Sequence, residues 1–533
     1  MQNLYFPATL RVQKASMSVD GVEIPLSPGT ALTVEIKTGK HRILEYLFSP
    51  LVETASRDEG AMRRGSGLRF AAAAALAILL SLRVGGAGAE TMRGALLKTY
   101  HTNPDLDEQR ANVRVRDEDV PKAAAGMRPN AGFQNNGGPQ RVGIKQPAGF
   151  GQYGNRAYTR DEYSGLPRNL TFSVMQPLFD GGKTTNSVRQ AESGVLAARA
   201  GLRQAEQDAL QKGATAYMNV LRDAAVAQLR KNNITVLQEQ LRVTRNRREF
   251  GEVTMTDVAQ AEAALAQARS DHEAALGALQ NSIANYVQVV GEEPKRLEPA
   301  PPLEALLPQS RDDAIRAALV EHPSIVSAEH QVDAAESAVH VAEAALLPTA
   351  SIGAQAIQTY DSYFGYPHTR QTSALLVGQL NVPLYQGGGE YAGIRQAKEQ
   401  LGQARIHADV VRAGVRAAVV QAYSQYSTAK AAIKFNAVAV KSAETALRGV
   451  RDEAAFGQRT TYDVLKAQQD LLGARVNLVT SQRDMVVGSY AILAAIGQLS
   501  LETLDRESPA YDPSVHFDQV KGKWIGLSTP DGM

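Results

Sequence analysis

Cysteine is absent from this chain of 533 residues, which excludes disulfide bonds and thiolate chemistry. A chain without cysteine fits an oxidising compartment such as the periplasm, although many cytosolic proteins lack the residue too. Aromatic residues are also scarce, with a single tryptophan at Trp524, and alanine is abundant. This composition favours closely packed helices over a large aromatic core. The 57 lysines and arginines nearly balance the 55 aspartates and glutamates, so the charge gives no reason to expect nucleic acid as a partner.

An apolar segment long enough to span a bilayer is missing as well. The longest apolar run, Phe70 to Leu82, has about 13 residues, whereas a transmembrane helix needs about 20. Met62-Arg63-Arg64 precedes this run and Ala87-Gly88-Ala89 follows it, which is the pattern of a secretory signal peptide and its cleavage site. We therefore predict a signal peptide at 62–89, with a transmembrane helix as the alternative. A mature chain that resides in a membrane would have to do so as a β-barrel.

What the sequence does contain is an internal duplication. A shift of 206 residues places the second copy on the first without a gap. The matching residues are Pro177 and Pro383, Tyr217 and Tyr423, Gly251 and Gly457, Thr254 and Thr460, Asp257 and Asp463, and Gly291 and Gly497. Upstream, Pro129 matches Pro348 with a shift of 219, so the first copy has 13 additional residues before Pro177. A repeat of this length indicates duplicated domains, which we place at 90–300 and 301–500, with a C-terminal tail at 501–533.

Each copy predicts the same first elements. A helix, at roughly 91–126 or 312–346, ends before a proline. Two strands follow in each copy, and residues 170–175 and 351–356 alternate with the period of two that is typical of strands. The stretch around 131–140 is a weaker candidate, because its Asn-Asn-Gly-Gly sequence favours a loop.

A turn and a pair of helices complete each copy. The turns comprise Pro177, Gly181 and Gly182 in the first copy and Pro383, Gly387 and Gly388 in the second. Proline-free stretches at 183–250 and 389–456 then predict helices of about 67 residues, roughly 100 Å long. A shorter helix returns at 255–290 or 461–496. The first and returning helices, stacked end to end, match the long helix, which needs coiled-coil-like neighbours.

The strand count predicts an assembly. Four strands per chain cannot close a membrane barrel, which has at least eight strands. Several chains must therefore share one barrel, and three chains would supply twelve strands.

The order and spacing of these elements resemble the TolC family of outer-membrane efflux and secretion proteins over residues 90–500. The resemblance is carried by Asn103-Pro104, Val120-Pro121, Pro129, the turns at 176–182 and 382–388, and the paired segments at 250–254 and 456–460. It implies an α+β membrane protein, a homotrimer whose 12-stranded outer-membrane β-barrel continues into a 12-helix periplasmic α-barrel. It also implies a Gram-negative outer-membrane location, contact with outer-membrane lipid, and no cofactor. The implied partners are a periplasmic membrane fusion (adaptor) protein and an inner-membrane ABC transporter or other pump.

The resemblance also implies that residues at the helix tips form an adaptor-docking site. Gly251, Thr254, Gly457 and Thr460 match the turns that form the periplasmic tip in this family. Glycine suits such a sharp reversal because it tolerates a positive φ. The alternative is that these residues cap helices and do nothing more.

A second set of residues matches the closed end of the pore. The set comprises Asp257, Arg459, Asp463 and Lys466, which match positions that link neighbouring helices or constrict the entrance. Ala454 stands where the best-known member has a linking tyrosine, and Lys466 stands where a second acidic residue is usual. These departures predict a weaker latch and a partly neutralised ring. Solvated charges at helix starts are the alternative.

Residues 1–61 form a block of their own, which resembles the C-terminal end of HlyD-type membrane fusion proteins. Val22-Glu23-Ile24 and residues 31–36 alternate like strands around a Pro-Gly turn. We predict that this block is the truncated tail of an adaptor, encoded in front of the outer-membrane protein and joined to it by a frameshift or by the choice of start site. We expect the mature protein to lack it. Adaptors of this type serve type I secretion, so the block favours that role.

Enzyme motifs fail on closer reading. Residues 387–392 fit a dinucleotide-binding pattern, but the helix that follows is too long for a βαβ unit. Residues 181–184 lack the first glycine of a phosphate loop, and His272-Glu273 lacks the second histidine of a zinc-protease motif. We therefore expect that this protein is not an enzyme. We predict the exit duct of a tripartite export system, most consistent with type I protein secretion. A multidrug efflux duct and a soluble periplasmic coiled-coil scaffold are the alternatives.

Overall fold

The computed structural model describes residues 16–19, 22–25, 90–150, 156–361, 369–505 and 508–530. The chain divides into two units, Met1–Gly86 and Ala87–Met533. In the first unit, β1 (Ser16–Val19) and β2 (Val22–Pro25) form an antiparallel hairpin. The predicted strand at 22–24 thus lies in β2, whereas the predicted strand at 31–36 and the signal peptide at 62–89 lie outside the described residues.

The first helix of each copy is broken, and the prediction of one continuous helix was wrong at this point. The first copy has α3 (Met92–Thr102), α4 (Pro104–Asp117) and α5 (Asp119–Ala124), and the second has α8 (Arg311–Glu321) and α9 (Pro323–Glu343). Asn103 and His322 interrupt the helices, and each caps the next one by accepting backbone N–H groups. A proline follows each cap, at a position where the missing N–H costs nothing.

Four strands form one antiparallel sheet in the order β3-β6-β7-β8. The strands are β3 (Asn130–Gly137), β6 (Arg168–Phe179), β7 (Thr349–Tyr360) and β8 (Arg370–Asn381). The expected count of four strands is therefore confirmed for this sheet. The weaker strand predicted around 131–140 is present as β3, although it ends at Gly137. All eight residues of β3 pair with β6, and this pairing satisfies a backbone that the local sequence does not favour.

The register of the sheet sorts apolar and polar side chains onto opposite faces. One row across the strands joins Phe133, Phe172, Ala356 and Ala374, and its neighbour joins Ala131, Val174, Ala354 and Leu376. The row between them, on the other face, joins Gly132, Ser173, Gln355 and Leu375. One face is mostly apolar and the other mostly polar, as the alternation in the sequence predicted, with Met175, Ile357 and Leu375 as exceptions on the polar face.

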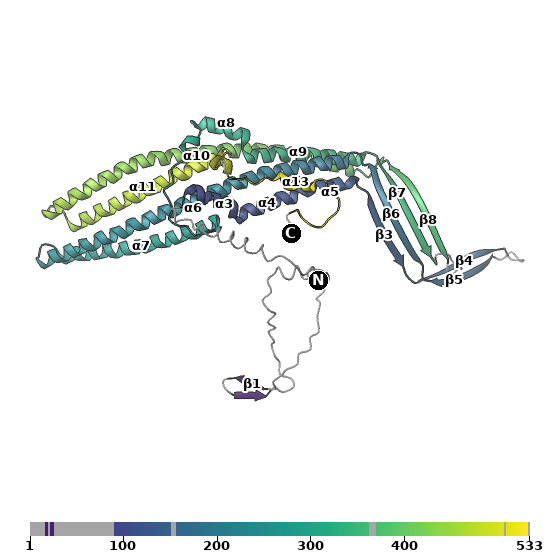
Figure 1. Ribbon diagram of the computed structural model, residues 1–533, viewed down its shortest axis with the longest axis horizontal. Coiled ribbons are helices and arrows are strands. Elements are labelled where there is room, and N and C mark those ends of the chain that lie inside the picture. Colours follow the sequence, from purple (N-terminus) through teal and green to yellow (C-terminus); the bar gives the residue numbers. More distant parts are fainter. Residues whose placement is uncertain are drawn as a thin grey trace, which may run out of the picture. The chain divides into compact units, whose positions relative to one another are not determined.

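The 13 additional residues of the first copy lengthen its hairpin. Strands β4 (Gln140–Phe150) and β5 (Arg156–Gly165) pair with each other as a separate two-stranded ribbon. Gln140 pairs with Gly165 and Gly137 pairs with Arg168, so one register runs through both ladders across Pro139 and Pro167. The ribbon leaves the sheet at an angle (Figure 1). The sequence reading assigned no strands to this segment.

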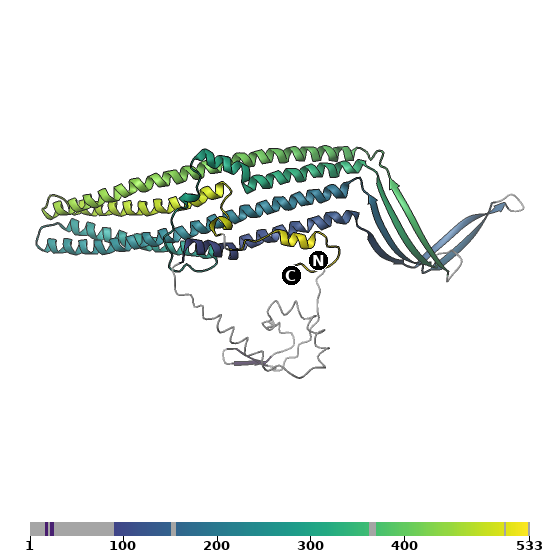
Figure 2. The same ribbon diagram turned by 45° about the horizontal axis from the view of Figure 1, so that its top comes forward.

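The long helices lie where the sequence placed them. They are α6 (Lys183–Glu249) and α10 (Gly389–Ala455), each of 67 residues, with α7 (Met255–Val290) and α11 (Thr461–Ala495) returning beside them. Helix α6 packs on α7 and also on α3, α4 and α9, and α10 packs on α9 and α11. Figure 2 shows these helices side by side, with the sheet continuing from one end. The short helices therefore stack along each long helix, which confirms the length argument.

The main core lies where α3, α6, α7 and α11 meet. Its largest fully buried side chains include Leu96, Leu210, Tyr217, Tyr286 and Ile492. A smaller cluster around Leu241 and Val258 lies nearer the tips. The remaining elements are α12 (Leu501–Leu504), α13 (Ser514–Val520) and the 3-10 turns at 125–127, 304–306 and 344–346. No helix among the described residues combines the length and the hydrophobicity needed to cross a bilayer.

Candidate functional site

The tip of each helix pair is a Schellman turn. After α6, Gly251 has φ +75° and donates its N–H to Arg248 O at 2.9 Å, and Glu252 donates to Arg247 O at 3.0 Å. After α10, Gly457 has φ +74°, and residues 457 and 458 repeat both bonds. Nothing lies within 4 Å of a Cβ added at either glycine, so the backbone conformation requires glycine here and the packing does not.

The returning helices begin with matching capping boxes. Asp257 N donates to Thr254 Oγ1 at 3.3 Å, while Thr254 N and Oγ1 donate to Asp257 Oδ2 at 2.9 and 2.7 Å. Thr460 and Asp463 repeat this geometry in the second copy. The threonine hydroxyl and the backbone N–H lower the pKa of both carboxyl groups, and the Thr461 hydroxyl adds to the effect at Asp257. The two predicted threonines and two predicted aspartates thus form capping boxes, and the two aspartates stay ionised at neutral pH.

The predicted latch residues have other partners within this chain. Arg459 Nε donates to Glu453 Oε2 at 2.8 Å, and Lys466 Nζ lies 3.9 Å from Asp470 Oδ1. Asp257 is held in its capping box. Arg459 would have to give up its ion pair with Glu453 to pair with Asp257. The latch between neighbouring helices therefore stays a prediction.

The two strand-to-helix turns differ in their surroundings. Gly181, Gly182, Gly387 and Gly388 all have positive φ values, and Pro177 sits at a register shift between β6 and β7, whereas Pro383 follows β8. A Cβ at Gly181 would lie 2.7 Å from Leu347 Cβ, whereas one at Gly387 would meet nothing within 4 Å. Asp180, which the sequence reading missed, accepts N–H groups from Gly182 and Thr184 and so caps α6.

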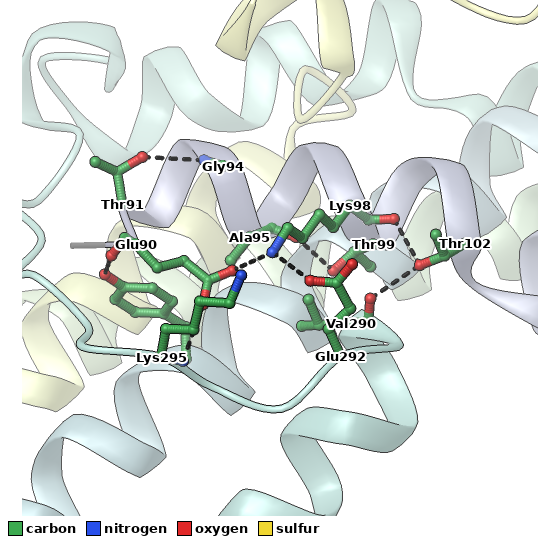
Figure 3. Close-up of polar contacts among 11 residues, drawn as sticks. Glu90, Thr91, Gly94, Ala95, Lys98, Thr99, Thr102, Val290, Glu292 and Lys295 are labelled. Carbon is green, nitrogen blue, oxygen red and sulfur yellow. Dashed lines mark hydrogen bonds and ion pairs between the residues drawn. The ribbon is translucent and has the colours of Figure 1, made fainter. Parts of the chain in front are cut away.

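A polar network at the start of the second unit was also missed. Lys98 Nζ bridges Glu90 Oε1 at 2.8 Å and Glu292 Oε2 at 2.7 Å (Figure 3), and these carboxylates raise the pKa of Lys98. Tyr217 OH lies 2.7 Å from both Glu90 O and Glu298 O, and burial raises its pKa to about 12. Residue 90 directly follows the predicted cleavage site, and the network ties it to the linker between the two repeats. The duplication of Tyr217 at 423 was the signal that could have drawn attention to it.

The chemistry of these sites is structural. The described residues hold no cluster of three or more histidines, aspartates and glutamates that could bind a metal ion. Large exposed apolar side chains lie on the sheet, at the helix tips and along the helices.

Each repeat supplies two strands of one shared sheet and a pair of long helices. Solved outer-membrane proteins have this fold. The solved structure of VceC from Vibrio cholerae has this fold, with a TM-score of 0.60 and 18% identity over 76% of this chain and 96% of that one. The chain belongs to the Outer membrane efflux protein family, whose sequence profile matches residues 98–292 and 314–498.

Characterised relatives include both efflux and secretion proteins. The Outer membrane efflux protein BepC of Brucella suis is 41% identical over 461 residues, which cover 86% of this chain and 97% of BepC. The Alkaline protease secretion protein AprF of Pseudomonas aeruginosa is 27% identical over 323 residues, 59% of this chain and 66% of AprF. The chain is therefore an outer-membrane efflux channel protein that extends into the periplasm, and it is not an enzyme. TolC-like channels are homotrimers that work with adaptor and inner-membrane pump proteins.

Proposed function

We propose that three copies of this chain form one 12-stranded barrel and one 12-helix tunnel, the exit duct of a tripartite export system. The observation that carries the proposal is the pair of open sheet edges. Within the described residues, β3 pairs only with β6 and β8 pairs only with β7, so each has an unpaired edge. An open edge is unstable in lipid, where every backbone group needs a partner. Pairing β8 of one chain with β3 of the neighbouring chain in the trimer satisfies the backbone groups of both edges.

The exposed apolar face of the sheet supports contact with lipid. Phe133, Phe172 and Leu376 lie on this face and are 69%, 51% and 71% exposed in the single chain. β6, β7 and β8 have 12 residues each, more than the 9–11 that a tilted membrane strand needs, whereas β3 has eight. A periplasmic scaffold that never enters a membrane would leave these side chains in water at a cost of about 25 cal/mol per Å².

Cysteine cross-linking between β3 and β8 tests this assembly, and the absence of native cysteine gives a clean background. Gln134→Cys would be combined in turn with cysteine at Ser373, Leu375, Val377 or Gln379, which all lie on the same face as Gln134. One register should give disulfide-linked trimers in the outer-membrane fraction, and pairs out of register should give few. Monomer in the periplasmic wash, with no cross-link at any register, would support the scaffold instead.

We place adaptor docking at the tips and pore constriction just inside them. Gly251, Thr254, Gly457 and Thr460 form two matching turns at the end of the helices farthest from the sheet, where a partner from the inner membrane would meet the tunnel. Asp257, Arg459, Asp463 and Lys466 lie within the first two turns of the returning helices or directly before them. The duplication supplies each trimer with six such turns, which a ring of adaptor subunits can grip. Site-specific photo-cross-linking from Thr254 and from mid-helix Ser270 tests docking, and only the tip position should capture the adaptor.

For the cargo we propose type I protein secretion, on the strength of the adaptor-like block at 1–61 and of relatives named for protease secretion. Efflux of small molecules is the second candidate, favoured by 41% identity to a protein named for efflux over nearly its whole length. Deleting the gene and measuring both the secreted proteins and the drug susceptibility separates the two. Loss of secreted protein with unchanged susceptibility supports secretion, and the reverse supports efflux.

We also propose that residues 1–61 and the signal peptide at 62–89 are missing from the mature protein, so that it begins at Glu90. N-terminal sequencing of protein purified from outer membranes tests this. A start at Met1 or Gln2 would contradict it.

A further inference from the structure

The C-terminal tail lies along the first copy and leads to the base of the sheet. Tyr511 N donates to Tyr100 OH at 3.0 Å on α3, and His516 Nδ1 lies 2.9 Å from Asp117 Oδ2 at the end of α4. Farther along, Lys523 O accepts from Arg128 Nη1 at 2.9 Å, two residues before β3 begins. The tail therefore runs along α3 and α4, and Lys523 reaches the segment directly before β3. Figure 1 shows α13 beside α4 and the chain turning back along the helices after this point.

The end of this tail exposes three large apolar side chains within four residues. Trp524, Ile525 and Leu527 are 65%, 90% and 104% exposed. The guanidinium of Arg128 lies 5.0 Å from the centre of the Trp524 ring and holds the ring at the base of the sheet. A tail that packs closely along α4 and then presents such a group to water is unusual unless something covers it.

Other exposed apolar side chains lie at the same level. Leu178 and Phe179 end β6, and Leu384 and Tyr385 follow β8 at the same end of the sheet, all at least half exposed. The side chain of Gln176 donates to Met127 O at 2.7 Å, which places the end of β6 beside Arg128. Trp524 therefore lies at the same end of the sheet as the exposed apolar ends of the strands.

We infer that the C-terminal tail is a membrane anchor, in which Trp524, Ile525 and Leu527 enter the periplasmic leaflet of the outer membrane. The inference rests on the proposed membrane insertion of the sheet. Tryptophan prefers the boundary between headgroups and acyl chains, because its ring is apolar and its N–H is polar. Arg128 places a positive charge beside the Trp524 ring, which suits the phosphates of lipid headgroups, whereas Lys521 is paired with Asp518. Lipid is the expected occupant because Trp524 lies at the end of the sheet where the apolar ends of β6 and of the segment after β8 are also exposed.

Tryptophan fluorescence tests the inference directly, because Trp524 is the only tryptophan in the chain. The full chain is reconstituted into phosphatidylglycerol and phosphatidylethanolamine vesicles, with or without bromine on the acyl chains. Bromolipid should quench the emission of Trp524 strongly, and aqueous acrylamide should quench it weakly. Strong quenching by acrylamide would place the tail in water and overturn the inference. Resistance to both quenchers would show that Trp524 is buried against another chain of the trimer, and this result would also overturn the inference.

Two variants separate this test from a failure of the proposed function. In the Trp524→Phe background, Phe172→Trp reports the apolar face of the sheet, and Phe456→Trp reports the exposed tip. Bromolipid should quench the tryptophan at 172 and leave that at 456 bright. If bromolipid quenches the tryptophan at position 172 but does not quench Trp524 in the unaltered chain, the sheet is in the membrane and the proposed anchor is wrong. If 172 also escapes quenching, the proposed membrane insertion itself fails.

Discussion

His516 Nδ1 lies 2.9 Å from Asp117 Oδ2, and the two side chains are 7% and 0% exposed. The contact joins the C-terminal tail to the last residue of α4, directly before the break that separates α4 from α5. Arg199 Nη2 lies 4.0 Å from the other oxygen of Asp117. The second copy has no such break between Pro323 and Glu343, so the tail supports the copy whose first helix is more interrupted.

Removing this contact should release the tail. His516→Ala leaves the buried Asp117 carboxylate without its main partner, which costs about 1–3 kcal/mol, or roughly a 5- to 150-fold shift in the docking equilibrium. Trypsin cleavage at Lys521 and Lys523 in detergent should accelerate by that factor. The matched control is His340→Ala, whose pair with Glu343 is exposed and should leave the cleavage rate unchanged. Equal rates in both variants would show that the tail is held elsewhere.

The buried tyrosines should titrate late. Burial raises the pKa values of Tyr217, Tyr426 and Tyr490 to about 12, from 10.0 for an exposed phenol. The folded chain keeps these protons while the unfolded chain loses them, so stability is complete below pH 10 and falls as the pH rises towards 12. Tyrosinate absorbance should show a late phase in the folded trimer, and Tyr217→Phe should reduce it. A single phase centred on pH 10 would be the contrary result.

Alanine at the tip should loosen it. Gly251→Ala forces a side chain into a left-handed conformation, which costs about 1–2 kcal/mol even though the space is open. Hydrogen exchange of residues 252–258 should accelerate. Gly277→Ala is the opposite control, because Gly277 is helical with open space around it, and alanine there should stabilise α7 by about 0.5–1 kcal/mol. Faster exchange in both variants would point to a packing effect.

The proposed latch predicts opposite effects for two neighbouring substitutions. Arg459→Ala removes the cation and should raise the single-channel conductance in planar bilayers. Glu453→Gln frees Arg459 from its partner within the chain, so that it can reach Asp257, and should lower the conductance. Arg475→Ala, which breaks an exposed pair in the middle of α11, is the control and should change nothing. A conductance that moves the same way in the first two variants rules out the latch.

The two strand-to-helix turns should respond unequally to the same change. Gly181→Ala and Gly387→Ala impose similar backbone strain, because φ is +69° and +78°. Only the first also drives a methyl group against Leu347. Overpacking of this kind typically costs about 1–3 kcal/mol. The yield of heat-modifiable trimer should fall further for Gly181→Ala, and equal yields would show that Leu347 moves aside freely.

The sequence by itself determined the long helices, the duplication and the strands whose residues alternate, at 170–175 and 351–356. Each of these depends on local pattern: freedom from proline over 67 residues, alternation with a period of two, and a constant shift between copies. The capping threonines and tip glycines were also visible, because caps are set by residues next to each other in the chain. Their reading as helix caps holds, whereas docking and gating depend on partners outside the chain.

Only the tertiary structure decided the rest. The polar stretch at Asn130–Gly137 became a strand because β6 satisfies its backbone, and local propensity is too weak to predict that outcome. The tail meets Asp117 and Arg128 across almost 400 residues of sequence. Contacts between residues so distant leave no periodic trace, so no local pattern predicts them.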